Sequence, residues 1–238
     1  MSAGIRLSLG SHEEIGIVSH PLVSESDDTA RDKYDWAGKP STSTPEVMRQ
    51  YDEFAATYDD TLLSKWGYQA PAMAAELLAR HAPLRSTVLD AGCGTGLTGR
   101  ELRRVGFESV QGVDISTSSL ELAASKGVYR ALVRADLQEP LPFLNDTFDA
   151  AICVGVLSYI SGDGLLRELC RVTRQGGVAV LSHRTDLVRA RSFGDMLAKL
   201  ATDGLWSPVF QSNPLPYLPG HPDFADHIHV QYFVFRVR

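Results

Sequence analysis

"TVLDAGCGTGLTGRELR", residues 87–103, places four glycines within eight positions, directly after a short apolar run that ends in Asp90. An apolar run, a cluster of glycines and a helical pattern predict a strand, a tight turn and a helix in succession. Glycines at this density let the backbone pass very close to another group. The stretch therefore predicts a ligand site at the end of a strand in an α/β sheet.

Strand and helix patterns continue to alternate after this stretch. The alternation predicts a parallel sheet with helices on both faces, because parallel neighbours need crossover helices. The last two strand-like pieces have a proline-rich loop and no helix between them, so they should pair antiparallel. The expected strands cover 86–92, 108–116, 128–137, 147–157 and 178–184, and the helices among them cover 96–106, 116–127, 162–177 and 186–204.

The chain of 238 residues is long enough for one sizeable core, with 44% apolar residues. Residues 1–44 mix polar and charged residues with little periodicity, which predicts a mobile N-terminal tail or lid. Thr44 is a candidate N-cap, with Pro45 as the first helical residue. A single domain is expected over 45–238, with a second N-terminal helix at about 69–81.

Charge and composition restrict the partners. The net charge is −6 and no segment is dense in lysine or arginine, so nucleic acid is not expected as the main partner. No apolar stretch approaches the roughly 20 residues of a membrane span, and the N-terminus does not resemble a signal peptide. Three cysteines indicate reduced thiols, which predicts a cytoplasmic protein, with the nucleus as the alternative.

The glycine stretch is compatible with three kinds of ligand. A P-loop requires a lysine after the glycines, and none follows here. Gly94, Gly96 and Gly99 formally satisfy the dinucleotide pattern Gly-x-Gly-x-x-Gly, with Asp114 at the end of the next strand. Asp90 argues against that pattern, because a carboxylate facing a pyrophosphate is repelled by roughly several kcal/mol. S-adenosylmethionine has an ammonium and a sulfonium instead, and a carboxylate attracts both.

Five segments together resemble the class I S-adenosylmethionine-dependent methyltransferases. They occur in the order of that family: "VLDAGCGTG", "GVDIS", "RADLQEPLPF", "FDAAICVGVLSYI" and "LCRVTRQGGVAVLS". The resemblance implies a three-layer, doubly wound, Rossmann-like α/β fold, in which a sheet of seven strands is mostly parallel and has a C-terminal antiparallel strand. It also implies methyl transfer from S-adenosyl-L-methionine, with S-adenosyl-L-homocysteine as the product.

The same resemblance implies a set of cofactor contacts. Asp90 would accept a hydrogen bond from the ammonium, directly or through water, and Asp114 would bind both ribose hydroxyls. Asp136 would bind the adenine amino group, and the Leu137 amide would meet a ring nitrogen. Tyr58 would cover the methionyl end. The remaining contact residues are Gly92, Cys93, Gly94, Ile115, Val154 and Tyr68.

The acceptor and any catalytic base are not determined by these motifs. The stretch after Val154 reads "VGVL" instead of Asn-Pro-Pro-aromatic, which argues against amino methylation of the nucleobase or glutamine type. Aromatic residues outside the motifs favour a small-molecule acceptor. His183 and Tyr159 are candidate bases. No metal is expected, because His227 and His229 lack a third suitably spaced ligand. An NAD-dependent oxidoreductase and a non-catalytic binding module remain as alternatives, and no oligomeric state is predicted.

Overall fold

The structure of the chain is a computed structural model, which describes residues 7–9, 13–15, 43–190 and 192–238. Within the predicted tail, β1 (Leu7–Leu9) and β2 (Glu13–Ile15) form an antiparallel pair. The other residues before 43 lie outside the described ranges, so the tail or lid over 1–44 stays a prediction.

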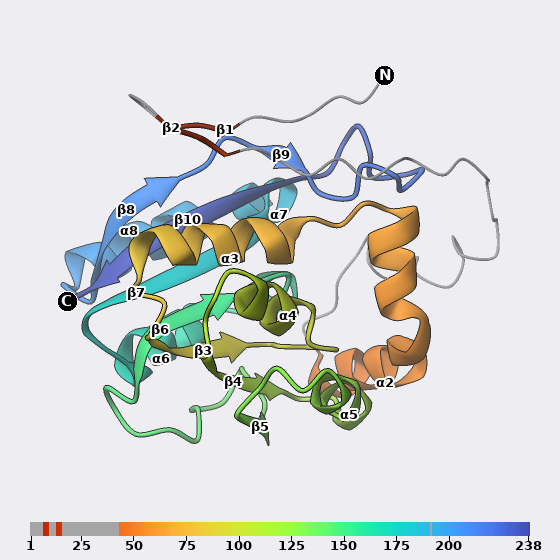
Figure 1. The fold of residues 1–238 in the computed structure, drawn as a ribbon. Coiled ribbons are helices and arrows are strands. Elements are labelled where there is room, and N and C mark those ends of the chain that lie inside the picture. The colour runs from red at the N-terminus through yellow and green to blue at the C-terminus, as the bar shows by residue number, and fades with distance from the viewer. Residues whose placement is uncertain (1–6, 10–12, 16–42, 191) are drawn as a thin grey trace.

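The main sheet has the predicted doubly wound, mostly parallel arrangement (Figure 1). Its strand order is β5-β4-β3-β6-β7-β10-β8, and the short β9 pairs with β10. β10 runs antiparallel to its neighbours, as predicted for the C-terminal strand, whereas β3 to β7 are parallel. The strands are β3 Thr87–Ala91, β4 Ser109–Asp114, β5 Ala131–Arg134, β6 Phe148–Cys153, β7 Thr173–Arg184, β8 Trp206–Gln211, β9 Leu215–Pro216 and β10 His229–Val237.

Helices cover both faces of this sheet, with α3 and α4 in front in Figure 1 and α6 and α8 behind. Successive strand residues point to opposite faces, so Val88 joins one core with α3 and Leu89 joins the other with α6 and α8. The helices are α2 Thr44–Asp60, the π-helical η2 Thr61–Lys65, α3 Ala70–His81, α4 Leu97–Arg104, α5 Thr117–Ser125, the 3₁₀ turn η3 Leu157–Tyr159, α6 Gly164–Val172, α7 Thr185–Ala190 and α8 Phe193–Thr202.

The expected bounds of α6, of β7 and of the helix at 186–204 are wrong. α6 ends at Val172, and the stretch expected to complete this helix starts β7 instead. A Cβ on Gly177 would lie 2.7 Å from the Asp149 carbonyl oxygen, so the two strands approach closely only because glycine stands there. The single helix expected over 186–204 is two helices, separated near Ser192, whose φ is +50°.

α2 begins one residue earlier than expected, since Thr44 is its first residue and the Val47 amide donates to the Ser43 carbonyl at 3.0 Å.

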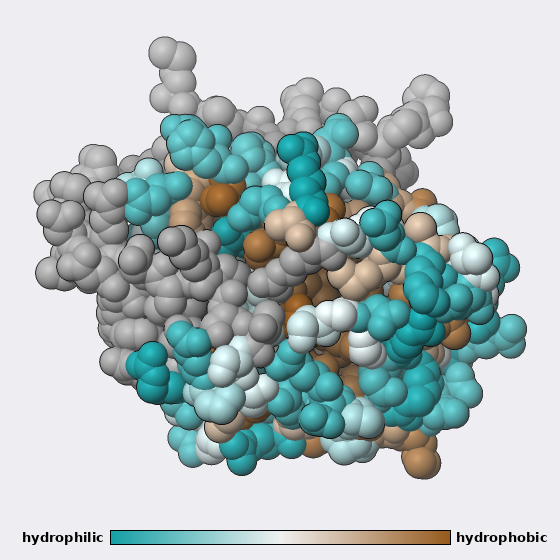
Figure 2. All heavy atoms as spheres, turned by 180° about the vertical axis from the view of Figure 1, so that it is seen from behind, coloured by the Kyte–Doolittle hydropathy of each residue, from teal (hydrophilic) through white to brown (hydrophobic). Residues whose placement is uncertain are grey.

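Seen from behind (Figure 2), the described surface is mainly hydrophilic, with hydrophobic residues in small areas between polar ones. In the described part of the chain, helices long and apolar enough for a bilayer span are absent.

Candidate cofactor site

The glycine turn is held against the end of β4. The amides of Gly92 and Cys93 both donate to the Val113 carbonyl, at 2.8 and 3.0 Å. Gly92 and Gly94 have φ values of +78° and +50°, in the region that favours glycine. The turn therefore has a fixed shape before any ligand binds.

The four glycines of the turn are required for different reasons. A Cβ on Gly92 would lie 2.2 Å from Val156 Cγ2, and Cβ atoms on Gly96 and Gly99 would lie 3.2 and 2.2 Å from ring atoms of Tyr129. A Cβ on Gly94 would meet no atom within 4 Å. Only Gly94 faces open space. The other three glycines are confined by packing, Gly92 against Val156, Gly96 against Ala123 and Tyr129, and Gly99 against Tyr129.

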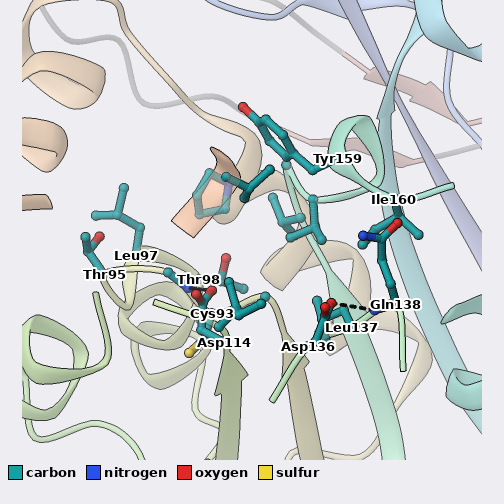
Figure 3. Close-up of a pocket in the computed structure, with 18 of the residues that line it drawn as sticks. Cys93, Thr95, Leu97, Thr98, Asp114, Asp136, Leu137, Gln138, Tyr159 and Ile160 are labelled. Atoms are coloured by element: carbon teal, nitrogen blue, oxygen red, sulfur yellow. Dashed lines mark hydrogen bonds between the residues drawn. The ribbon is translucent and has the colours of Figure 1, made fainter. Parts of the chain in front are cut away.

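A pocket opens beside Gly94 at the carboxyl ends of β3, β4 and β6, the edge of an open sheet at which ligands bind. It encloses about 860 Å³ of space, a figure that includes open solvent at its mouth. Figure 3 shows Asp114 with the glycine turn on one side and Asp136, Gln138 and Ile160 on the other. The lining residues are Thr44, Val47, Tyr68, Pro71, Gly92, Cys93, Gly94, Thr95, Leu97, Thr98, Asp114, Ile115, Asp136, Leu137, Gln138, Val154, Gly155, Val156, Tyr159 and Ile160.

Asp114 ends β4 with its carboxylate in the wall of the pocket. Oδ2 accepts from the Gly94 amide at 2.8 Å, and Oδ1 accepts from the Ser116 amide at 2.9 Å. Burial raises the pKa of this carboxyl, against the effect of these two hydrogen bonds. The bonds hold both oxygens in place, and each oxygen keeps a second lone pair for a ligand hydroxyl.

Asp136 lies across the pocket, in the loop after β5. Its Oδ1 accepts from the Gln138 amide at 2.9 Å, and its Oδ2 accepts from Thr44 Oγ1 at 2.8 Å. Thr44 Oγ1 also accepts from Gln138 Nε2 at 3.1 Å. The first residue of α2 thus closes one side of the pocket, and sequence reasoning had given Thr44 only a capping role.

Asp90 does not line the pocket, although its position before the glycines predicted that it would face the ligand. It is buried under the turn, where Oδ2 accepts from the Tyr129 hydroxyl at 2.7 Å. Burial raises its pKa to about 7, although the Tyr129 hydrogen bond acts in the opposite direction. The carboxylates in the pocket wall are therefore Asp114 and Asp136, with Asp90 one layer below.

α2 is fastened to the elements around the pocket at two further points. Asp52 Oδ1 accepts from Ser116 Oγ, the N-cap of α5, at 2.5 Å. Near the end of α2, Asp59 Oδ1 accepts from Thr95 Oγ1 in the glycine turn. Lys126 Nζ lies 2.8 Å from Asp59 Oδ2 and also donates to the Thr95 carbonyl. These contacts join α2 to the turn that the ligand must touch.

Most of the expected contact residues come together in this one pocket. The residues that do so are Gly92, Cys93, Gly94, Asp114, Ile115, Asp136, Leu137, Val154 and Tyr68. Tyr58 belongs to α2, but its side chain lies outside what the structure describes, so its role stays a prediction. His183 lies in a second pocket, while Tyr159 lines the first.

Several lining residues carried no recognisable signal in the sequence. Thr98, Gln138 and Ile160 are ordinary residues in a helix and two loops, and only the fold brings them to the pocket. Gln138 directly follows Asp136 and Leu137, which were predicted as contact residues. This position in the sequence is the one feature that could have identified Gln138 as a lining residue. Val47 and Pro71 come from the N-terminal helices for the same topological reason.

The charge of the pocket fits S-adenosylmethionine and not a pyrophosphate. The described lining residues include two aspartates and no lysine, arginine or histidine. A phosphate-bearing cofactor would meet like charges without a compensating cation. The open space at Gly94, the oriented Asp114 carboxylate and the apolar wall of Ile115 and Leu137 suit a ribose and an adenine. In the described residues, no group of three or more His, Cys, Asp or Glu side chains is arranged to hold a metal ion.

This sheet order and this pocket define a class I S-adenosylmethionine-dependent methyltransferase. Residues 89–181 match the family described as "Methyltransferase domain". Methyltransferase-like protein 27 of Homo sapiens is 38% identical over 173 residues, which cover 68% of each chain. The chain belongs to this methyltransferase family, and S-adenosyl-L-methionine is its cofactor.

Two further comparisons agree. The tRNA (carboxymethyluridine(34)-5-O)-methyltransferase of Arabidopsis thaliana is 32% identical over 152 residues, which cover 59% of this chain and only 34% of that protein. A SAM-dependent methyltransferase of Thermotoga maritima has the same fold, with a TM-score of 0.59 and 17% identity over 79% of this chain and 98% of its own. Four phrases of the sequence, "YDEFAATYDD", "LDAGCGTGL", "GVDIS" and "FDAAICVGVLS", also predict a likeness to the methyltransferase-like protein of the Williams–Beuren syndrome chromosome region. The match to Methyltransferase-like protein 27 confirms this likeness.

Proposed function

We propose that the acceptor is a small, mainly apolar molecule that binds in a second pocket beside the cofactor pocket. The observation that carries this proposal is that Ile160 lines both pockets, so a molecule in the second one lies next to the cofactor. The second pocket lies between η3, the end of β7 and the starts of α6 and α8. Its lining residues are Leu157, Ile160, Ser161, Gly162, Leu165, Leu166, His183, Phe193 and Met196.

The lining chemistry supports a neutral acceptor. Most of these side chains are apolar, and no described lining residue has a carboxylate, an ammonium or a guanidinium group. A charged acceptor would lose its hydration there without a counter-charge. Apolar walls with a few polar groups are typical of small-molecule sites.

His183 is the candidate for the proton transfer. When bound, S-adenosylmethionine supplies an electrophilic methyl group on a sulfonium. An acceptor O–H or N–H that gains a methyl group must lose its proton, and histidine is suited to accept it near neutral pH. The His183 ring is buried and packs edge-on against Phe193, with ring centroids 4.6 Å apart, which holds the imidazole in a defined orientation.

An RNA acceptor is the alternative, because the similar plant protein is a tRNA methyltransferase by name. A protein that binds an RNA backbone usually presents a basic surface. The net charge of −6 and the absence of a lysine- or arginine-dense segment favour the small molecule.

The test is methyl transfer from labelled S-adenosylmethionine into a cell extract that has been separated into small molecules, RNA and protein. The wild type should label the small-molecule fraction. Met196→Trp, which fills the second pocket, should abolish this labelling while the Kd for S-adenosylhomocysteine stays within about twofold. Asp195→Asn, on the same helix but outside the lining, is the matched control. Label that enters RNA, or that survives Met196→Trp, contradicts the proposed acceptor site.

A further inference from the structure

Tyr129 lies beneath the glycine turn, in the connection between α5 and β5. Cβ atoms added to Gly96 and Gly99 would lie 3.2 Å from Tyr129 Cε2 and 2.2 Å from Tyr129 Cζ. The ring therefore fills the space that a side chain at Gly99 would occupy, and together with Ala123 it crowds the space beside Gly96. Tyr129 itself does not line the cofactor pocket.

The Tyr129 hydroxyl connects two elements that shape the turn. It accepts from the Gly99 amide at 3.0 Å, in the first turn of α4, and it donates to Asp90 Oδ2 at 2.7 Å, at the end of β3. A phenol can donate one hydrogen bond and accept another, so both functions are used. Removal of this one oxygen would leave a helix amide and a buried carboxyl without this partner.

Asp90 retains an unused acceptor. Its side chain is 1% exposed, and Oδ1 has no hydrogen-bond partner among the described residues. The titratable groups around it are the Tyr129 phenol, the Asp114 carboxyl and the thiols of Cys93 and Cys153. None of these groups is a cation. Among the described residues, the carboxyl therefore lacks a positive partner beneath the glycine turn.

We propose that Tyr129 is a positioning residue for cofactor binding, which holds Asp90 and the first turn of α4 in place beneath the glycine turn. The charge of Asp90 then acts on the cofactor's ammonium from below the turn, without direct contact, so that binding depends on loss of a proton from Asp90. This proposal does not involve the acceptor, so it stands independently of the second pocket. It requires only that the chain binds the cofactor of its family.

The linkage has a definite sign. An ammonium near the turn favours the ionised form of Asp90, so a protein whose Asp90 is protonated must release that proton when the cofactor binds. Affinity therefore rises with pH below the pKa of Asp90, by up to about tenfold per pH unit, and levels off above it. The hydrogen bond from Tyr129 favours the ionised form of Asp90. Loss of this hydrogen bond therefore moves the pH range in which cofactor affinity increases to higher pH.

Calorimetric titration with S-adenosylhomocysteine from pH 5.5 to 7.5 tests the proposal. This range stays below the usual pKa of an α-amino group, about 7.7–8.0, so most of the ligand carries its ammonium throughout. The wild type should bind about tenfold or more tightly at pH 7.5 than at pH 5.5. Tyr129→Phe should bind about three- to thirtyfold more weakly at pH 7, with its affinity still rising at pH 7.5. Tyr232→Phe removes a buried hydroxyl far from the turn and should retain the wild-type profile.

Asp90→Asn keeps the shape of the carboxyl but does not titrate, and it covers the case that Tyr129→Phe folds poorly. Its affinity should be nearly constant over this pH range, and titrations in buffers of different ionisation enthalpy should detect no proton release. A wild-type pH profile in folded Tyr129→Phe, or an unchanged pH dependence in Asp90→Asn, overturns the proposal.

Discussion

Thr44 Oγ1 lies 2.8 Å from Asp136 Oδ2, which joins the first residue of α2 to the loop after β5 across the mouth of the cofactor pocket. The two residues are 92 positions apart in the chain. The start of α2 is therefore part of the site. The contribution of this hydrogen bond to the stability of α2 can be tested without a ligand.

Thr44→Val should loosen the first turn of α2. A hydrogen bond of this kind contributes about 1 kcal/mol net, so exchange of the Val47 amide with solvent deuterium should become about fivefold faster. Thr202→Val removes a hydroxyl that donates to the Ala198 carbonyl at 3.0 Å on α8, and it should leave Val47 unaffected. Equal exchange at Val47 in all three proteins would show that this contact does not hold α2.

Asp114→Ala should weaken binding of S-adenosylhomocysteine by about 2–3 kcal/mol, or tens-fold or more in Kd. The loss has two sources, since the carboxylate is expected to bind the ribose and also holds the amides of Gly94 and Ser116. Calorimetry measures the affinity. A lower Tm of the variant without ligand would show that loss of the hydrogen bonds from the two amides contributes. An unchanged Kd would remove Asp114 from the site.

Gly94→Ala and Gly127→Ala form a matched pair. Both glycines have positive φ, +50° and +63°, and a Cβ at either position meets no atom within 4 Å. Each substitution should cost about 1 kcal/mol of stability, from the left-handed backbone alone. Only the Cβ at position 94 enters the cofactor pocket, so only Gly94→Ala should lose measurable binding. Comparable binding by both variants would mean that the cofactor does not approach Gly94.

Asp90→Asn should alter how stability changes with pH in the cofactor-free protein. The pKa of Asp90 is raised from 3.8 to about 7. Between these values the folded state binds a proton that the unfolded state does not, so stability falls by about 1.4 kcal/mol per pH unit as pH rises. Asparagine does not titrate, so the variant does not lose stability in this way as pH rises. The Tm of the variant minus the Tm of the wild type should therefore increase from pH 5 to pH 8. Parallel Tm curves would contradict the raised pKa.

The sequence determined most of the fold because its strands and helices alternate with clear glycine and capping signals. The errors lie where tertiary contacts override local pattern. The stretch after Val172 has helix-compatible residues, but its glycine pair allows β7 to approach the Asp149 carbonyl and start early. The break near Ser192 has no proline, and the nearby Gly194 falls inside the first turn of α8 instead of at the end of α7, so the usual signals of a helix end do not mark it.

The place of Asp114 in the pocket wall could be predicted because its motif ends a strand, whereas the direction of the Asp90 side chain could not. Asp90 is the last residue but one of β3, yet its carboxyl points to Tyr129 instead of the pocket. Tyr129 lies outside the glycine stretch and forms no motif with it. Its importance follows from three-dimensional packing that spacing along the chain does not encode.

The position of β10 has a consequence for how the protein is made. β10 (His229–Val237) lies between β7 and β8, and among the described strands β8 pairs only with β10. On the ribosome, β8 therefore emerges before the strand that admits it to the sheet. Until then the growing chain exposes two open strand edges, which is when nascent proteins aggregate or recruit chaperones. In the folded protein Trp206 Nε1 donates to the Leu197 carbonyl at 3.2 Å, a contact between β8 and α8 that does not require β10.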